Sequence, residues 1–132
     1  MIFVDTSFFV GATDPADNRH ADVVALLDAR GHERLVTSNH VLGEVWTFLR
    51  RRRGHPEALR FVEQIEESAD VEVAFIGSEL ERDAWAWLRR HDERPYSFVD
   101  ATSFALMRHL RIGRAFAFDG DFSAAGFVEL RA

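Results

Sequence analysis

Five acidic residues of this chain stand where carboxylates could bind a metal ion. Asp5 directly follows a short apolar run at residues 2–4, and Asp119 and Asp121 follow another at residues 115–118. Because unbroken apolar runs are typical of buried strands, these acids are predicted to lie at the carboxyl edge of a sheet, where open α/β folds bind ligands. Carboxylate oxygens are also the ligands that Mg2+ prefers.

Two further acids, Glu44 and Asp100, occur in helical patterns among apolar residues. Because an unpaired carboxylate is costly to bury, Glu44 pairs with an arginine, lies at the edge of the apolar face, or points into a cleft. Asp100 either caps its own helix, in a Ser-x-x-Asp box with Ser97, or faces the same cleft. Gly43, beside Glu44, would allow another backbone to approach closely. Converging carboxylates repel one another unless a cation lies between them, so a cluster of these acids predicts a bound metal.

The elements that must position these acids can be predicted from apolar periodicity. Residues 8–11 lead from the first strand into a turn-forming cluster at residues 14–18. Helical spacing and start signals predict helices at residues 20–30, at 40 to about 53, from Pro56 onward, from a Ser78/Glu81 capping box onward, and from Ser97 to about 110. Short apolar runs predict strands at residues 2–4, 35–37, 71–75, 114–118 and 127–130. Strands that alternate with helices predict an α/β fold, in which helices cover both faces of a parallel sheet.

Composition limits the class of protein. A chain of 132 residues is long enough for one domain, at residues 1–132, with a real core. The absence of cysteine excludes disulfides, thiolate zinc sites and cysteine nucleophiles, and the six histidines form no zinc-hydrolase pattern. No apolar run is long enough to span a bilayer and no signal segment precedes the first strand, so we expect a cytoplasmic protein without a membrane partner.

Charge gives a mixed indication. The net charge of -6 argues by itself against binding to nucleic acid. A dense basic run nevertheless ends the helix that carries Glu44, and Arg89, Arg90 and Arg94 could form a second patch. The basic run is either a solvated helix end, where the dipole favours cations, or a set of phosphate contacts for RNA. Its members, which we predict to bind substrate, are Arg50, Arg51, Arg52 and Arg53.

Four acidic motifs in this order resemble those of the PIN-domain ribonucleases and, within them, the VapC toxins of bacterial and archaeal toxin–antitoxin pairs. The motifs are IFVDTS at residues 2–7, VLGE at 41–44, SFVDA at 97–101 and FDGDF at 118–122. Their order and spacing extend the resemblance over essentially the whole chain. One departure is Ala117, where many members carry a threonine or serine.

The resemblance implies a three-layer α/β/α fold and an acidic pocket that holds Mg2+ or Mn2+. It also implies cleavage of structured RNA, such as a tRNA or rRNA loop, inhibition by a cognate VapB-type antitoxin, and a homodimer. The catalytic quartet maps onto Asp5, Glu44, Asp100 and Asp119. Asp121 corresponds to a less regular fifth acid, expected to bind metal with Asp5, Asp100 and Asp119, while Thr6 or Ser7 would contact substrate through a hydroxyl or backbone group.

Three alternatives remain open on the sequence. A phosphatase with an Asp-x-Asp pair would carry that pair after its first strand, whereas here the pair comes near the end of the chain. The same acidic pocket could hydrolyse DNA, since both backbones are phosphodiesters. A non-catalytic partner-binding module with the same fold would be expected to have lost one or more acids, and none is missing here.

Overall fold

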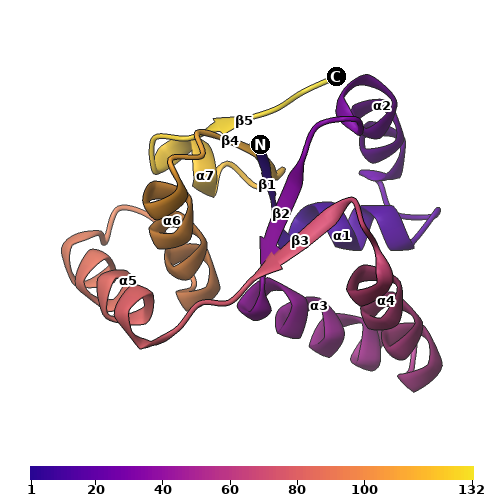
Figure 1. The fold of residues 1–132 in the computed structure, drawn as a ribbon, viewed down its shortest axis with the longest axis horizontal. Helices are drawn as coiled ribbons and strands as arrows, with labels where there is room; N and C mark the ends of the chain where they lie inside the picture. Colours follow the sequence, from indigo (N-terminus) through magenta and orange to yellow (C-terminus); the bar gives the residue numbers. More distant parts are fainter.

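The computed structural model describes all 132 residues and contains one five-stranded, all-parallel sheet (Figure 1). The strand order is β3-β2-β1-β4-β5. The strands are β1 (Ile2–Val4), β2 (Leu35–Ser38), β3 (Val71–Ala74), β4 (Arg114–Phe116) and β5 (Val128–Glu129). The predicted α/β class with a central parallel sheet is therefore confirmed, although β4 and β5 are shorter than the apolar runs that predicted them.

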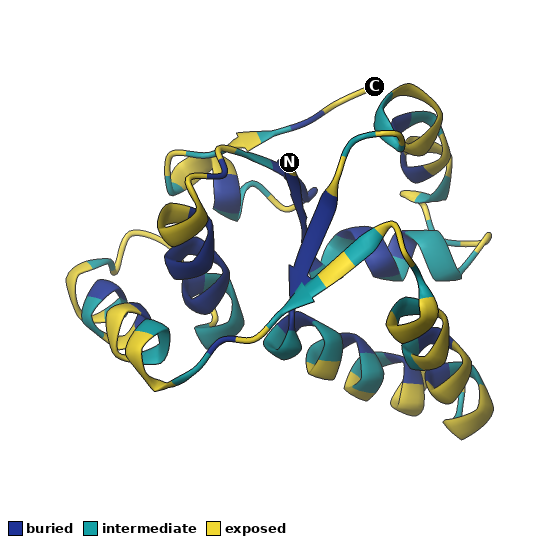
Figure 2. Ribbon diagram, viewed as in Figure 1, coloured by how far each residue is buried: buried dark blue, intermediate teal, exposed yellow.

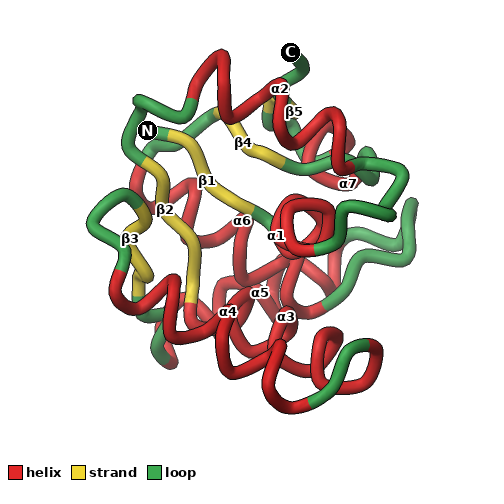
Figure 3. The backbone as a smooth tube through the Cα atoms, turned by 90° about the vertical axis from the view of Figure 1, so that its right-hand side faces the viewer, coloured by secondary structure: helices red, strands yellow, loops and turns green.

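Helices cover both faces of this sheet. Helices α5 and α6 lie on one face, α1, α2 and α4 on the other, and α3 passes below the carboxyl ends of the strands (Figures 1 and 3). None of them has the length and hydropathy of a membrane span. The helices are α1 (Thr6–Thr13), α2 (His20–Arg30), α3 (Asn39–Arg52), α4 (His55–Glu67), α5 (Ser78–Arg90), α6 (Phe98–Leu110) and α7 (Asp121–Ala124).

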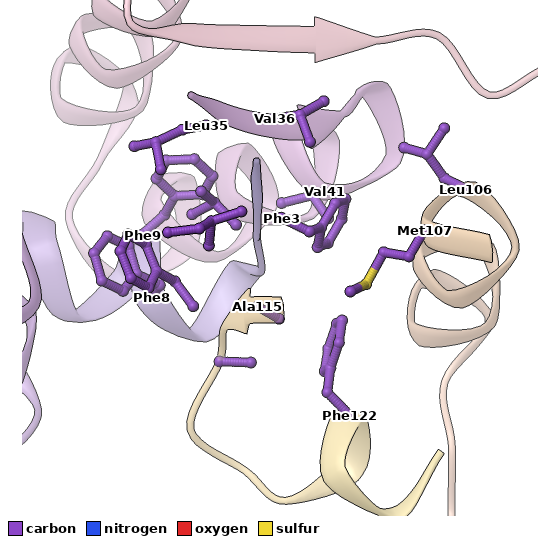
Figure 4. Packing of buried hydrophobic residues seen from close by; sticks show 14 of the residues in the cluster. Phe3, Phe8, Phe9, Leu35, Val36, Val41, Leu106, Met107, Ala115 and Phe122 are labelled. Carbon is purple, nitrogen blue, oxygen red and sulfur yellow. The ribbon is translucent and has the colours of Figure 1, made fainter. Parts of the chain in front are cut away.

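The core is built around β1, whose three residues are fully buried. Figure 2 shows β1 and β2 buried throughout, whereas the edge strand β3 is partly exposed. Phe8 and Phe9 of α1 lie on one side of β1, and Met107 and Phe122 on the other (Figure 4). Phe8 stacks on Phe116 of β4 with 4.5 Å between ring centres. Burial on both faces explains why β1 shows no alternation of apolar and polar residues.

Helix α1 is the longer of two helices that the sequence did not predict, the other being the four-residue α7. Its apolar segment gives no clear period, and such short runs suit a buried helix as well as a strand. Asp5 is its N-cap and Asp14 its C-cap, so the chain turns into a helix immediately after β1. The consequence is that Asp5 stands at the junction of a buried strand and a helix N-terminus.

The predicted capping box at Ser78 and Glu81 was wrong. Helix α5 begins at Ser78 itself, the preceding Gly77 takes the cap position, and no side chain caps this end. The Glu81 carboxylate instead contacts Nε2 of His40 at 3.1 Å, which links α5 to α3. The box at Ser97 is present as predicted, and the Ser38 side chain caps α3.

The strand order places the ends of β1 and β4 at a topological switch point. From β1 the chain builds outward through β2 to β3, and then crosses to β4 on the other side of β1. Open α/β sheets bind ligands beyond the carboxyl ends of the two strands at such a point. Asp5 directly follows β1, and Asp119 follows β4 by three residues.

Candidate active site

Asp5 is buried and held by the residues that follow it. Its side chain is 3% exposed, and Oδ2 accepts hydrogen bonds from Oγ of Ser7 at 2.8 Å and from the Ser7 backbone N–H at 3.3 Å. The Ser7 hydroxyl in turn accepts a hydrogen bond from the backbone N–H of Phe118 at 3.3 Å. Ser7 therefore connects the acid after β1 to the chain that leaves β4.

Asp100 is both a helix cap and a cleft residue, so its two interpretations hold together. Its Oδ2 accepts from the backbone N–H of Ser97 at 3.0 Å, and its own N–H donates to Oγ of Ser97 at 3.0 Å. The same residue also lines a cleft beyond the carboxyl ends of β1 and β4. The capping box thus fixes the orientation of an acid that remains accessible from the cleft.

The four predicted catalytic acids line this one cleft, which has a volume of about 480 Å³. They reach it from four different elements: Asp5 from the end of β1, Glu44 from α3, Asp100 from the start of α6 and Asp119 from the loop after β4. Glu44 forms no salt bridge, so the alternative in which an arginine pairs with it was wrong. Thr6 and Ser7 also line this cleft.

No other part of the backbone approaches Gly43 closely. A Cβ atom added at this position would meet nothing within 4 Å, so no neighbouring backbone requires the glycine. The prediction of a close contact there was wrong because this side of α3 faces open space.

Asp121 lies beside the cleft without lining it. Its Oδ1 accepts a hydrogen bond from Nε of Arg94 at 2.8 Å, in an ion pair between the α5–α6 loop and the start of α7. Arg94 also donates from Nη2 to the backbone oxygen of Asp119 at 3.2 Å. The fifth acid is therefore occupied by an arginine, unlike the four cleft acids.

The four arginines of the basic run have different contacts. Arg50 and Arg51 are exposed and do not line the acidic cleft. The guanidinium of Arg52 lies 5.2 Å from the centre of the Phe48 ring, and Nη1 of Arg53 pairs with Asp14 at 3.2 Å. The run is therefore not one continuous basic patch.

Arg19 is a cleft residue that the sequence did not predict. It lines the cleft from the α1–α2 loop, and its Nη2 donates to the backbone oxygen of Phe118 at 3.4 Å. Its guanidinium also lies 5.1 Å from the centre of the Phe118 ring. Only the tertiary contact between positions 99 residues apart identifies it, because the local sequence indicates no more than a turn.

Burial and mutual repulsion raise the pKa values of the cleft acids. The pKa of Asp5 rises to about 7, chiefly through burial and further through the charges of Asp119 and Asp100, against the opposing hydrogen bond from Ser7. Burial likewise raises the pKa of Asp100 to about 6, with Asp121 and Asp119 adding to the shift. Partial desolvation and Asp121 also raise the pKa of Asp119. Negative charge in this cleft is therefore costly unless a cation compensates it.

The residues present fit a hard divalent cation. As the side chains lie, no three or more acidic or histidine groups already surround a single point. Mg2+, however, takes only one or two protein carboxylates and keeps several waters. In addition, Thr6 lines the cleft, and its Oγ1 is buried without a hydrogen-bond partner.

The chain belongs to the PIN domain family, whose model matches residues 2–128. It is 54% identical over 131 residues to the 23S rRNA-specific endonuclease VapC20 of Mycobacterium tuberculosis, covering 99% of this chain and 98% of that protein. The resemblance to PIN-domain VapC toxins that the four acidic motifs indicated is therefore confirmed.

Two solved structures share the fold. One is the crystal structure of Mycobacterium tuberculosis VapC20, described as a sarcin–ricin loop cleaving toxin, which matches with a TM-score of 0.94 and 52% identity over the full length of both chains. The other is FitAcB from Neisseria gonorrhoeae, with a TM-score of 0.68 and 17% identity over 98% of this chain and 96% of that one. The second likeness concerns the fold alone.

Proposed function

We propose that this chain is a metal-dependent endoribonuclease toxin that cleaves the sarcin–ricin loop of 23S rRNA in the cytoplasm. The observation that carries the proposal is an acidic cleft at the switch point in a chain 54% identical, end to end, to a 23S rRNA-specific endonuclease. This narrows the wider expectation of a tRNA or rRNA loop. The alternatives are cleavage of DNA and a purely partner-binding role, and both can be tested by comparing RNA and DNA as substrates.

Asp5, Asp100 and Asp119 are the residues that would hold Mg2+ or Mn2+. A divalent ion bound there would supply charge stabilisation on the phosphoryl oxygens. Ser7 orients the Asp5 carboxylate and Ser97 orients that of Asp100, so neither acid needs to reorganise when substrate binds. A metal role for Asp121 stays a prediction, and its ion pair with Arg94 favours a positioning role instead.

Glu44 is the acid that we assign to proton transfer. It forms no ion pair and reaches the cleft from α3, an element that carries none of the other three acids. In the reaction a water oxygen bonds to phosphorus, the bond from phosphorus to the leaving oxygen breaks, and the leaving oxygen takes up a proton. A free carboxylate at the cleft wall can accept the proton that the attacking water loses.

A VapB-type antitoxin is the protein partner that we propose. The surface that supports it is an apolar groove of about 440 Å³ between α1, α2 and α4, which is lined by the side of α1 opposite to the one that lines the acidic cleft. Leu27, which is 40% exposed, lies at the rim of this groove. An amphipathic helix buries its apolar face in such a groove. The apolar lining includes Phe8, Phe9, Ala12, Leu27, Leu49, Phe61 and Ile65.

A homodimer is the assembly that we propose, and exposed aromatic residues support it. Phe75, after β3, is 80% exposed, and Trp85 of α5 is 49% exposed while stacking on Phe98 with 4.5 Å between ring centres. Large aromatic side chains are enriched in protein interfaces. Light scattering of the wild-type and Trp85→Lys proteins tests this, because a dimer through this face would become a monomer in the variant.

The experiment that tests the function uses intact ribosomes, total RNA and a plasmid DNA, each with Mg2+ or Mn2+ and with EDTA. The Asp5→Asn protein is the inactive comparison, and Asp28→Asn, an exposed acid of α2, is the control for a lost charge. We expect one metal-dependent cut in the sarcin–ricin loop that only Asp5→Asn abolishes. Cuts in DNA alone would favour the alternative nuclease, and no cut in any substrate would favour the binding module.

A further inference from the structure

One face of α3 carries an acid, an aromatic ring and a cation on successive turns. Glu44, Phe48 and Arg52 are spaced four residues apart, so they lie along the same side of the helix. We call these three residues the α3 stripe. At 1.5 Å of rise per residue the stripe extends roughly 12 Å along the helix axis, away from the catalytic acids.

The stripe runs along two neighbouring clefts. Glu44 and Phe48 line the acidic cleft, whereas Phe48 and Arg52 line a second cleft of about 390 Å³. The two clefts share Val10, Asp17 and Phe48 along their walls. Phe48 therefore stands at the passage from one cleft to the other.

The Phe48 ring is placed to receive a flat partner. Phe48 is half-buried and packs against the core with part of its surface, while the rest faces both clefts. The Arg52 guanidinium lies over this ring, 5.2 Å from its centre, so a base would reach the ring face by displacing the guanidinium, which no ion pair holds in place. An aromatic ring and a free guanidinium together form the kind of platform on which unpaired RNA bases stack.

We propose that Phe48 and Arg52 form a base-stacking subsite, which holds the nucleotide next to the phosphate that is cut. The base would stack on Phe48, and the Arg52 guanidinium would cover the base edge or contact the adjoining phosphate. This inference rests on the proposed function, because it names how the same cleft grips a single-stranded part of its RNA. It also separates Arg52 from Arg50 and Arg51, which line neither of these two clefts.

The test measures binding of sarcin–ricin loop oligoribonucleotides in which one base at a time, on either side of the cut, is replaced by an abasic residue. All proteins carry Asp5→Asn so that the RNA stays intact, and fluorescence anisotropy gives the Kd. Phe48→Leu keeps the apolar volume and removes the ring, whereas Phe48→Trp keeps a ring. Arg52→Met and Arg51→Met remove the same charge at a cleft position and at a solvated position.

We expect Phe48→Leu to raise the Kd roughly 5- to 100-fold for intact RNA, the range for one lost stacking contact. Phe48→Trp should restore binding. One abasic position should weaken binding to the protein with Phe48 but cause no further loss in Phe48→Leu, because the stacking partner is already gone. In Arg52→Met the abasic residue at that position should likewise cause little further loss of binding. In Arg51→Met it should weaken binding as much as it does in the protein with both arginines.

Abasic penalties that are equal in the Phe48 and Phe48→Leu proteins at every position would overturn the subsite. The Arg52→Met and Arg51→Met pair tests the same subsite without any change to the apolar wall, so a folding defect cannot mask the result. Failure of the proposed function would look different: the protein without Asp5→Asn would leave the loop uncut. The binding comparison decides the subsite in either case.

Discussion

Arg94 and Asp121 form an ion pair between the α5–α6 loop and the start of α7, beside the acidic cleft, with 2.8 Å between Nε and Oδ1. Through Nη2, Arg94 also binds the backbone oxygen of Asp119, so one guanidinium fixes the whole turn after β4. Gly120 in this turn has a φ of 85° and would bring a Cβ within 3.4 Å of the same Nη2. The contact therefore positions a cleft acid without adding a charge to the cleft itself.

Arg94→Met should lower kcat for loop cleavage by roughly 10- to 100-fold, the usual cost of losing a group that orients a metal ligand. Because the ion pair is partly exposed, the free energy of unfolding should change by less than about 1 kcal/mol. Arg89→Met, an exposed cation of α5, is the matched control and should leave kcat unchanged. Equal effects of the two substitutions would show that only net charge matters.

Asp119→Asn and Asp121→Asn should separate a metal ligand from a positioning residue. Asp119→Asn is expected to abolish cleavage and to weaken Mn2+ binding measured by calorimetry. Asp121→Asn should reduce kcat only as far as Arg94→Met does, and combining it with Arg94→Met should cause no additional loss, since both remove one contact. A loss of Mn2+ affinity in Asp121→Asn as large as in Asp119→Asn would instead make Asp121 a ligand.

The sequence predicted the cleft better than it predicted the contacts around it. Asp5 and Asp119 could be placed because each follows a buried strand, and strand ends converge at one edge of a parallel sheet. Both roles of Asp100 could be predicted from its immediate neighbours. The positions of Arg19 and Arg94 in the site could not be predicted. Arg19 donates to a backbone oxygen 99 positions away and Arg94 to a carboxylate 27 positions away, and both contacts depend on how loops pack against one another. Neighbouring residues in the sequence therefore predict caps and strand ends but not contacts between distant loops.

Stability of the ion-free protein should fall as pH rises from about 4 to about 7. The unfolded Asp5 carboxyl ionises near its ordinary pKa of 3.8, but the folded one only at about 7, so the folded chain binds an extra proton between these values. Asp5→Asn mimics the protonated form and should remove this slope. At pH 8 the variant should be more stable than the wild type by on the order of 2–4 kcal/mol.

Urea unfolding in EDTA at pH 5 and pH 8 measures this difference directly. At pH 5 the gap between the two proteins should be clearly smaller than at pH 8, because only part of the range from about pH 4 to about pH 7 has been crossed. Adding Mg2+ at pH 8 should stabilise only the wild type, because the ion compensates the ionised carboxylates. A gap between the two proteins that is the same at both pH values would contradict the assignment of the slope to Asp5.

Gly43→Ala should stabilise the protein by roughly 0.5–1 kcal/mol, since glycine inside a helix costs conformational entropy and here has no steric purpose. A new Cβ would meet no atom within 4 Å. Thermal unfolding measures the gain, and unchanged KM and kcat would show that Glu44 keeps its place. Gly120→Ala, at a left-handed position, is the contrasting variant and should destabilise. A loss of stability in Gly43→Ala would mean that this face of α3 is covered in the assembled protein.

Leu27→Glu should weaken inhibition by the antitoxin about 10-fold or more while leaving RNA cleavage intact. Leu27 lies at the rim of the apolar groove, where a carboxylate would be forced against the apolar side of a bound helix. Val24→Glu is the matched control, because Val24 is on the same helix, is similarly exposed at 44% against 40%, and lies outside the groove. The concentration of antitoxin that halves the cleavage rate is the measured quantity. If this concentration rises equally in the two variants, the antitoxin binds elsewhere. If it rises in Leu27→Glu alone, the antitoxin binds the groove, on the side of α1 opposite to the catalytic acids that it inhibits.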